Sequence, residues 1–112
     1  MKSYKVAVIP GDGIGVEVVK SSIEVLNKLQ EGKNFKLEFN EFDWSSEYYF
    51  KHGKMMPEDG IKQLENHDAI FLGAVGHPDI QDHITLNGLL LPIRRAFDQF
   101  ACVRPSILYP GV

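Results

Sequence analysis

Two arginines near the end of the 112-residue chain have the residue type and spacing that suit a carboxylate ligand. Arg94 and Arg104 lie ten positions apart, and the planar fork of a guanidinium binds a carboxylate through two parallel hydrogen bonds. The surrounding pattern predicts a helix at Arg94 and a returning strand at Arg104, so both side chains could point into one pocket. The alternative for a single arginine is a surface ion pair or a solvent-facing position, which we expect for Arg95.

A glycine turn at residues 11–15 is a second candidate site. It joins a predicted buried strand to a predicted helix, and free amides at the start of a helix commonly bind anions. Its spacing is G-x-G-x-G, with Val16 where the dinucleotide fingerprint has its third glycine. The charge of Asp12 inside the turn would also oppose a phosphate. The local sequence therefore favours a structural turn and a ligand site equally.

The elements that must position these residues alternate between strands and helices. Apolar and turn-forming residues predict strands over 4–9, 36–43, 69–72 and 101–109. They predict helices from the glycine turn to Gly32, over 44–52, from Pro57 onward and over 87–99. This alternation predicts an α/β fold, a mainly parallel sheet with helices on both faces.

Helical spacing identifies the apolar faces of the first and last helices. The first helix carries two apolar stripes, one with Val18, Val25 and Leu29 and the other with Val19, Ile23 and Leu26. The last helix has Leu89, Ile93 and Phe97 on its apolar side. If that helix is regular, Asn87 and Arg94 lie on one face, but Pro92 is expected to kink or restart it.

Composition and charge exclude several classes of protein. The formal net charge of -3 and the scattered basic residues give no reason to expect a nucleic acid or an anionic membrane as a partner. No apolar run reaches the ~20 residues of a membrane-spanning helix. The first residues lack the longer apolar region and small-residue cleavage site of a signal peptide, so we expect none. Cys102 is the only cysteine, so an internal disulfide is impossible, and we expect it to be a buried apolar filler. These features predict a soluble, cytoplasmic protein.

Several segments together resemble a known family. They are residues 9–15 (IPGDGIG), 72–76 (LGAVG), 93–95 (IRR), 98–100 (DQF), 103–105 (VRP) and 110–111 (PG). Their order and spacing resemble the isopropylmalate–isocitrate dehydrogenase family across the whole chain. Its tartrate/D-malate dehydrogenase branch is similar at Trp44 and at residues 47–49, 52–57, 82–86 and 88–89. Asn87 departs from that branch, which has tryptophan there, and from isopropylmalate enzymes, which carry an acidic residue. It is more similar to the isocitrate pattern.

The resemblance implies an NAD-dependent oxidoreductase that needs Mg²⁺ or Mn²⁺. Such an enzyme oxidises and decarboxylates a small 2-hydroxy dicarboxylic acid, here tartrate or D-malate. Isopropylmalate or isocitrate is the alternative substrate. A non-catalytic module that binds an anion or a protein partner is the alternative function.

The resemblance also implies roles for individual residues. The implied substrate-binding residues are Arg94, Arg104 and Thr85, and the implied cofactor-binding residues are Ile14, Ala74, Val75, Gly76 and Asn87. Each of the uncharged residues has a structural alternative. Thr85 and Asn87 could cap the helix that follows, residues 74–76 could form only a strand-ending turn, and Ile14 could belong to the core.

The family enzymes are several times longer than this chain. Their catalytic residues, metal ligands and adenosine-binding loop come from sequence outside these residues. The resemblance therefore implies that residues 1–112 are the N-terminal part of an isopropylmalate dehydrogenase-like domain, incomplete and inactive alone. The four histidines show no metal-ligand spacing. For the full-length protein we expect a homodimer with a small dicarboxylate substrate, and no nucleic acid or membrane partner.

Overall fold

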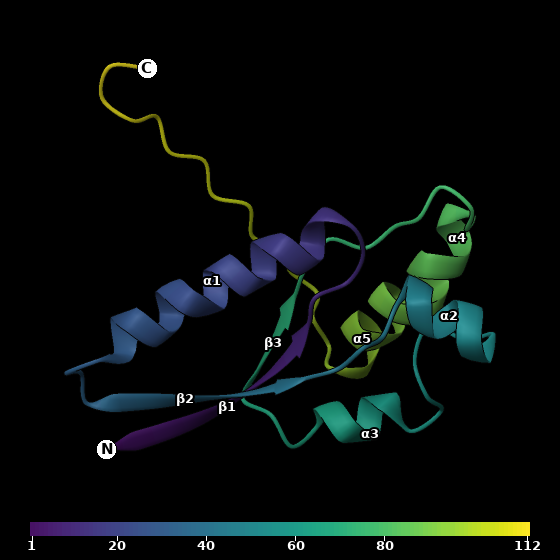
Figure 1. Cartoon of the computed structure of the whole chain (residues 1–112), viewed down its shortest axis with the longest axis horizontal. Helices are drawn as coiled ribbons and strands as arrows, with labels where there is room; N and C mark the ends of the chain where they lie inside the picture. The colour runs from purple at the N-terminus through teal and green to yellow at the C-terminus, as the bar shows by residue number, and fades with distance from the viewer.

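Strands and helices alternate along the chain in a computed structural model that describes residues 1–112 (Figure 1). In order, the elements are β1 (Lys2–Ile9), α1 (Ile14–Gln30), β2 (Phe35–Glu41), α2 (Ser46–His52), α3 (Gly60–Leu64), β3 (Ala69–Leu72), α4 (Asp82–Thr85), the π-helix η1 (Leu86–Leu90) and α5 (Leu91–Ala96). None of the helices combines the length and apolar character that crossing a bilayer requires.

The three strands form one parallel sheet with β1 at its centre. Their order is β2-β1-β3, with Lys2 opposite Phe35 and Val6 opposite Ala69. The second half of β1, residues 6–9, is buried completely or nearly so. A continuous apolar run suits a central parallel strand because both of its faces are covered.

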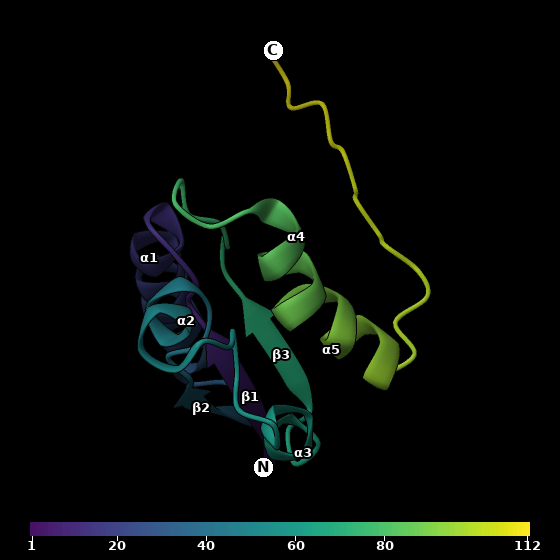
Figure 2. The same ribbon diagram turned by 90° about the vertical axis from the view of Figure 1, so that its right-hand side faces the viewer.

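Successive residues of β1 contribute to two separate cores. Ala7 and Ile9 pack with residues of α2, α3 and the α4–α5 run, in a cluster whose other buried members are Trp44, Met55, Leu64, Ile80, Leu89 and Ile93. Val6 and Val8 pack with Val19 of α1 on the opposite face. Figure 2 shows α1 and α4–α5 on opposite sides of the strands. The predicted α/β fold with helices on both faces of a parallel sheet is confirmed.

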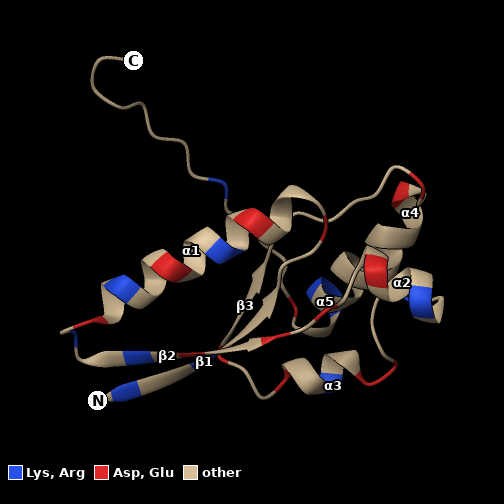
Figure 3. Ribbon diagram, viewed as in Figure 1, with Lys and Arg blue, Asp and Glu red and all other residues tan.

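Only one of the two predicted stripes of α1 packs on the sheet. Val19 is buried and Ile23 packs against the same cluster, whereas Val18 and Val25 are 52% and 67% exposed. A single helix meets a sheet along a narrow stripe, so the outer stripe has nothing to cover it here. Figure 3 shows acidic and basic positions alternating along α1.

The predicted helix over residues 87–99 begins earlier and is less regular than expected. Helical structure is continuous from Asp82 to Ala96, and its middle turn is the π-helix η1. Pro92 lies in the first turn of α5, where it has no amide to donate to the preceding turn. The helical run does not stop at Pro92, but the regular helix α5 begins beside it, at Leu91, directly after the π-turn.

The helix predicted from Pro57 also begins later than expected. Residues 57–59 form a turn, in which the amide of Gly60 donates to the carbonyl of Pro57 at 2.9 Å. The regular helix α3 follows and buries Leu64. Proline and the two acidic residues after it therefore mark the approach to the helix instead of its first turn.

The predicted strand over residues 101–109 is wrong. These residues form no strand and are all exposed, and the segment runs away from the sheet (Figures 1 and 2). The sheet ends at β3 on that side, so the segment has no ladder partner, and Pro105 has no amide to donate. Cys102, expected to be buried, is exposed for the same reason.

Candidate functional site

The glycine turn and the loop after β3 meet at the carboxyl end of the sheet. Ile9 and Leu72 end their strands side by side, and the amide of Asp12 donates to the carbonyl of Ala74 at 2.7 Å. Gly11 has a φ of 84°, and a Cβ there would lie 2.1 Å from the Ala74 carbonyl oxygen. Only glycine permits so close an approach. The turn is therefore filled by the neighbouring loop, which favours its structural interpretation over a phosphate cradle.

The carboxylate of Asp12 is buried and fully hydrogen-bonded. Its Oδ2 accepts hydrogen bonds from Ser45 Oγ at 2.7 Å, Ser46 Oγ at 2.7 Å and the Gly76 amide at 2.8 Å, and its Oδ1 accepts from the Ser46 amide at 3.0 Å. Burial raises the pKa of the Asp12 carboxyl, but the bonds from Gly76, Ser45 and Ser46 together outweigh burial and leave it below its usual value. The carboxylate is thus held in its charged form.

Sequence patterns did not reveal this arrangement around Asp12. Its partners lie 33, 34 and 64 positions away, so no local motif connects them. The available signal was a charged residue in a turn between a buried strand and a helix. Such a charge requires compensating hydrogen-bond donors. The structure shows that Ser45 and Ser46 supply them.

Thr85 carries a buried hydroxyl that has no hydrogen-bond partner. The residue is 4% exposed, and its Oγ1 is buried and unpaired. The alternative role as a helix cap is wrong, because helical structure already begins at Asp82 and Thr85 makes no capping bond. An unsatisfied buried polar group costs about 1–3 kcal/mol, and such a group calls for an explanation.

The three arginines are free of ion pairs. The ion pairs are Lys28–Glu31, Lys54–Glu58 and His77–Asp79. Arg94 and Arg95 line an open hollow of about 220 Å³ at the end of α5. The surface ion pair considered for a lone arginine is therefore absent at both positions, and Arg95 is exposed as expected.

Arg104 lies on the exposed segment and not on a returning strand. It does not line the hollow of Arg94, and its Nε donates to Cys102 Sγ at 3.4 Å. That hydrogen bond and the charge of Arg104, followed by the charge of Arg94, lower the pKa of the Cys102 thiol. Arg94 and Arg104 therefore do not share a pocket here.

The residues assigned to the cofactor fall in two places. Ala74 and Gly76 are exposed on the loop after β3, and Ile14, at the start of α1, is 64% exposed. Asp12 joins these two segments. Val75 is half-buried and packs against the larger core, so its side chain contributes to the packing of the protein. The core role considered for Ile14 does not fit its exposure.

Asn87 is exposed on η1, apart from the first group of cofactor residues. The predicted common face of Asn87 and Arg94 assumed a regular helix. The π-turn between them adds a residue to one turn and shifts the later side chains around the axis by up to ~100°. Their shared face is therefore not preserved.

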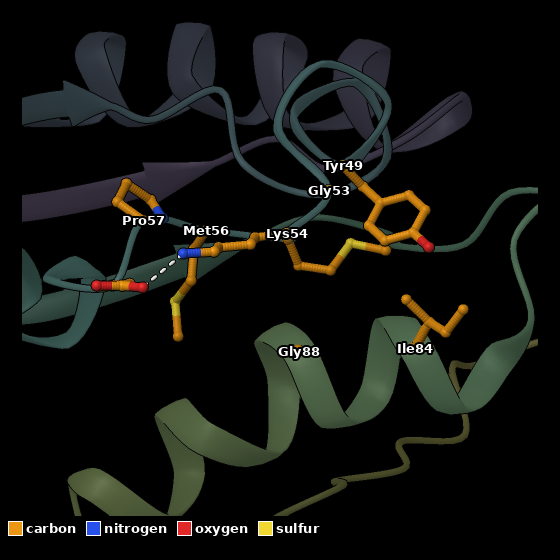
Figure 4. A pocket seen from close by; sticks show the side chains of 9 residues that line it. Tyr49, Gly53, Lys54, Met56, Pro57, Ile84 and Gly88 are labelled. Carbon is orange, nitrogen blue, oxygen red and sulfur yellow. Dashed lines mark hydrogen bonds and ion pairs between the residues drawn. The ribbon is translucent and has the colours of Figure 1, made fainter.

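A separate cavity of about 390 Å³ opens between the segment after α2 and the α4–η1 run. Figure 4 shows Tyr49 and Ile84 on its two sides. Lys54 and Glu58 also line the cavity and form an ion pair at 2.6 Å. Gly88 faces Met55 closely, because a Cβ on Gly88 would lie 2.9 Å from Met55 Cγ. None of the predicted site residues lines this cavity.

The sequence of the chain matches a known enzyme family over almost its whole length. Residues 5–112 match the model of the isocitrate/isopropylmalate dehydrogenase family. The chain belongs to this family. The resemblance predicted from the motifs around the glycine turn, the loop after β3 and the arginines is thereby confirmed.

Individual relatives within the family are similar over the whole chain. A probable tartrate dehydrogenase/decarboxylase of Agrobacterium vitis is 55% identical over 113 residues, which cover 100% of this chain and 32% of the relative. The decarboxylating D-malate dehydrogenase of Escherichia coli K12 is 53% identical over 114 residues, with coverage of 100% and 32%. The chain thus spans about a third of the length of these relatives.

A solved structure agrees with the fold. The crystal structure of a β-decarboxylating dehydrogenase from Thermococcus kodakarensis, in its apo form, matches with a TM-score of 0.62 and 28% sequence identity. The match covers 85% of this chain and 27% of that protein. The three-stranded parallel sheet with its helices is therefore part of an isopropylmalate dehydrogenase-like fold.

Proposed function

We propose that this chain is part of an NAD-dependent, metal-requiring enzyme that oxidises and decarboxylates tartrate or D-malate. The observation that carries the proposal is the 53–55% identity, over the whole chain, to relatives with those names. The active protein is further proposed to be a cytoplasmic homodimer with an isopropylmalate dehydrogenase-like domain to which residues 1–112 contribute.

The reaction sets the task for the residues of this chain. The hydroxyl-bearing carbon of the acid loses a hydride to NAD⁺ and its hydroxyl loses a proton, which gives a keto acid. The carboxylate on the carbon next to the new carbonyl group then leaves as carbon dioxide, and the remaining enolate takes up a proton. A divalent metal, when bound, stabilises the enolate oxygen.

Substrate recognition is assigned to Arg94, Arg104 and Thr85. The guanidinium of Arg94 has no ion-pair partner of its own, so it is available to bind a carboxylate. Thr85 has an unsatisfied hydroxyl for a substrate oxygen. Arg104 would have to move from its exposed position to join them. Movement of the segment around it would bring the second guanidinium to the same dianion.

Cofactor contacts are assigned to Ile14, residues 74–76 and Asn87. The exposed backbone of the loop after β3 lies at the carboxyl edge of a parallel sheet, which is where ligands bind in open α/β folds. Small side chains at Ala74 and Gly76 permit close approach. These residues fit one wall of a nicotinamide pocket.

The residues of this chain do not by themselves fit a metal ion. No three His, Cys, Asp or Glu side chains gather closely enough to hold one. The metal ligands are therefore assigned to parts of the enzyme outside these residues, and no role in metal binding is given to His77, Asp79, Asp82 or His83.

A second candidate substrate class is isopropylmalate or isocitrate, favoured by Asn87 in place of the tryptophan of the tartrate/D-malate branch. The test is NADH formation by the complete protein with D-malate, tartrate, isopropylmalate and isocitrate, with and without Mn²⁺. L-malate serves as the stereochemical control. We expect metal-dependent turnover led by D-malate or tartrate. A lead by another acid would correct the substrate, and no turnover from folded protein would overturn the proposal in favour of a binding or interaction module.

A further inference from the structure

Asp12 holds the loop after β3 at two points. Its backbone amide donates to the carbonyl of Ala74 at 2.7 Å, and its side chain accepts from the amide of Gly76 at 2.8 Å. One residue of the glycine turn therefore fixes both ends of the three-residue stretch 74–76. Ala74 and Gly76 are exposed, and within this stretch only the side chain of Val75 packs against the core.

The conformation of this loop needs such support. Gly76 has a φ of 145°, which side-chain-bearing residues rarely adopt and which glycine adopts among many others. A glycine with nothing within 4 Å of its would-be Cβ is not held by packing. Its hydrogen bond to Asp12 is the contact that selects one conformation.

The same carboxylate extends the connection to a third segment. Ser45 and Ser46, at the beginning of α2, donate three hydrogen bonds to it. Both serines are buried, so these bonds are shielded from water and the carboxylate cannot turn away from Gly76 without leaving donors unsatisfied. The orientation of the carboxylate is thus fixed before it meets the loop.

We propose that Asp12 is a positioning residue that pre-shapes residues 74–76 for the nicotinamide cofactor. The inference rests on the proposed function, which assigns that loop to NAD. Asp12 does not touch the cofactor itself. Its negative charge, which argues against a phosphate in the turn, is used internally to order the neighbouring loop.

Aspartate is the residue type that this task requires. All four groups that face it are donors, and only an ionised carboxylate offers acceptors alone on both oxygens. In Asp12→Asn one of the two oxygens is replaced by an NH2 group, which points its own hydrogens at donors. The side-chain volume is almost unchanged, so this substitution removes the negative charge and one of the two acceptor atoms while leaving packing intact.

The experiment compares the complete protein with its D12N variant, and uses D43N as the matched control because Asp43 is exposed and makes no hydrogen bond or ion pair. Three quantities are measured: hydrogen exchange of the Gly76 amide by NMR, the Kd of NAD by calorimetry, and KM for NAD against kcat. For D12N we expect exchange at Gly76 and the Kd and KM of NAD to rise about tenfold, with kcat at saturating NAD within about twofold. D43N should match the unaltered protein.

The split between KM and kcat separates positioning from general damage. A merely structural role would lower the folded fraction and hence kcat, and would leave the KM for NAD of the remaining enzyme unchanged. Folded D12N with unaltered Gly76 exchange and NAD affinity overturns the role of Asp12. If the unaltered protein itself fails to bind NAD, the proposed function is overturned together with the role of Asp12. That result is distinguishable from the first, in which the unaltered protein binds NAD.

Should D12N fail to fold, the serines decide the question. Ser45→Ala and Ser46→Ala each remove one donor and leave the carboxylate and its bond to Gly76 in place. We expect each to raise the Kd of NAD about threefold and the double variant to raise it further. An unaltered Kd in the folded double variant would contradict the proposal.

Discussion

The amide of Leu91 donates to the carbonyl of Leu86, five residues earlier in the chain. This π-turn contains Asn87 and separates Thr85 from Arg94, so these three side chains are not arranged as on a regular helix. Turns of this kind are frequent at functional sites. The proposed substrate contacts Thr85 and Arg94 lie on either side of the π-turn and the proposed cofactor contact Asn87 lies within it, which makes their relative placement sensitive to its geometry.

Arg94 is expected to bind a substrate carboxylate with its planar fork. Arg94→Lys keeps the charge but loses the bidentate geometry, so kcat/KM for the dicarboxylate should fall about 30- to 700-fold, equal to ~2–4 kcal/mol. Arg95→Lys is the matched control, because Arg95 is also exposed and also lines the hollow. Steady-state kinetics measure both. An equal, small effect in the two variants would remove Arg94 from the substrate site.

Thr85→Val is expected to act in opposite directions on stability and on activity. Valine has nearly the same shape and removes the unpaired buried hydroxyl, so the free energy of unfolding should rise by about 1 kcal/mol. If the hydroxyl binds substrate, the KM for the dicarboxylate should rise as well. Urea unfolding and steady-state kinetics provide the two readouts. A loss of stability would mean that the hydroxyl has a partner within the protein.

Ser45 combines a positive φ of 108° with a hydrogen bond to Asp12, and two substitutions separate these effects. Ser45→Ala loses the bond and keeps the strained backbone, whereas Ser45→Gly loses the same bond but relieves the strain. Strain of this kind costs about 1–3 kcal/mol. We therefore expect Ser45→Gly to be the more stable by about 1 kcal/mol in chemical denaturation. The reverse order would show that the conformation at Ser45 is not strained.

The ionised state of Asp12 should contribute to stability in a pH-dependent way. Its pKa is lowered in the folded protein, so its contribution is present above the unfolded pKa of ~3.9 and is lost as the pH falls through the folded value. The difference in free energy of unfolding between the unaltered protein and Asp12→Asn should therefore shrink on acidification. Urea unfolding from about pH 6 to pH 3 measures it, and a difference that stays constant would contradict the prediction.

The parts of the fold that were predictable depend on local sequence. The apolar run before the glycine turn predicted β1, and the spacing of Val19 and Ile23 predicted the buried stripe of α1. The exposed outer stripe around Val18 was not distinguishable from it, because periodicity does not say what covers a face. The strand expected around Arg104 failed for a related reason, since a strand requires a neighbour that local patterns cannot supply.

Family motifs name residues for the site, and these assignments remain predictions. The sequence assigned Arg94, Thr85 and residues 74–76, but not the internal use of the Asp12 charge. Burial of that charge depends on Ser45 and Ser46, which no local spacing connects to it. The π-turn was missed because the choice between two hydrogen-bond registers around Pro92 depends on packing of the whole helical run.

The contact between the glycine turn and the loop after β3 is made of backbone on both sides, and this restricts sequence drift. A Cβ on Gly15 would lie 2.5 Å from the Pro10 carbonyl oxygen, and one on Gly73 would lie 2.1 Å from the same atom. Neither clash involves a flexible side chain that could be exchanged for a smaller one. A side chain at either glycine therefore cannot be accommodated by making a neighbouring side chain smaller. Pairs of compensating substitutions, by which protein cores ordinarily evolve, are not available at these two positions.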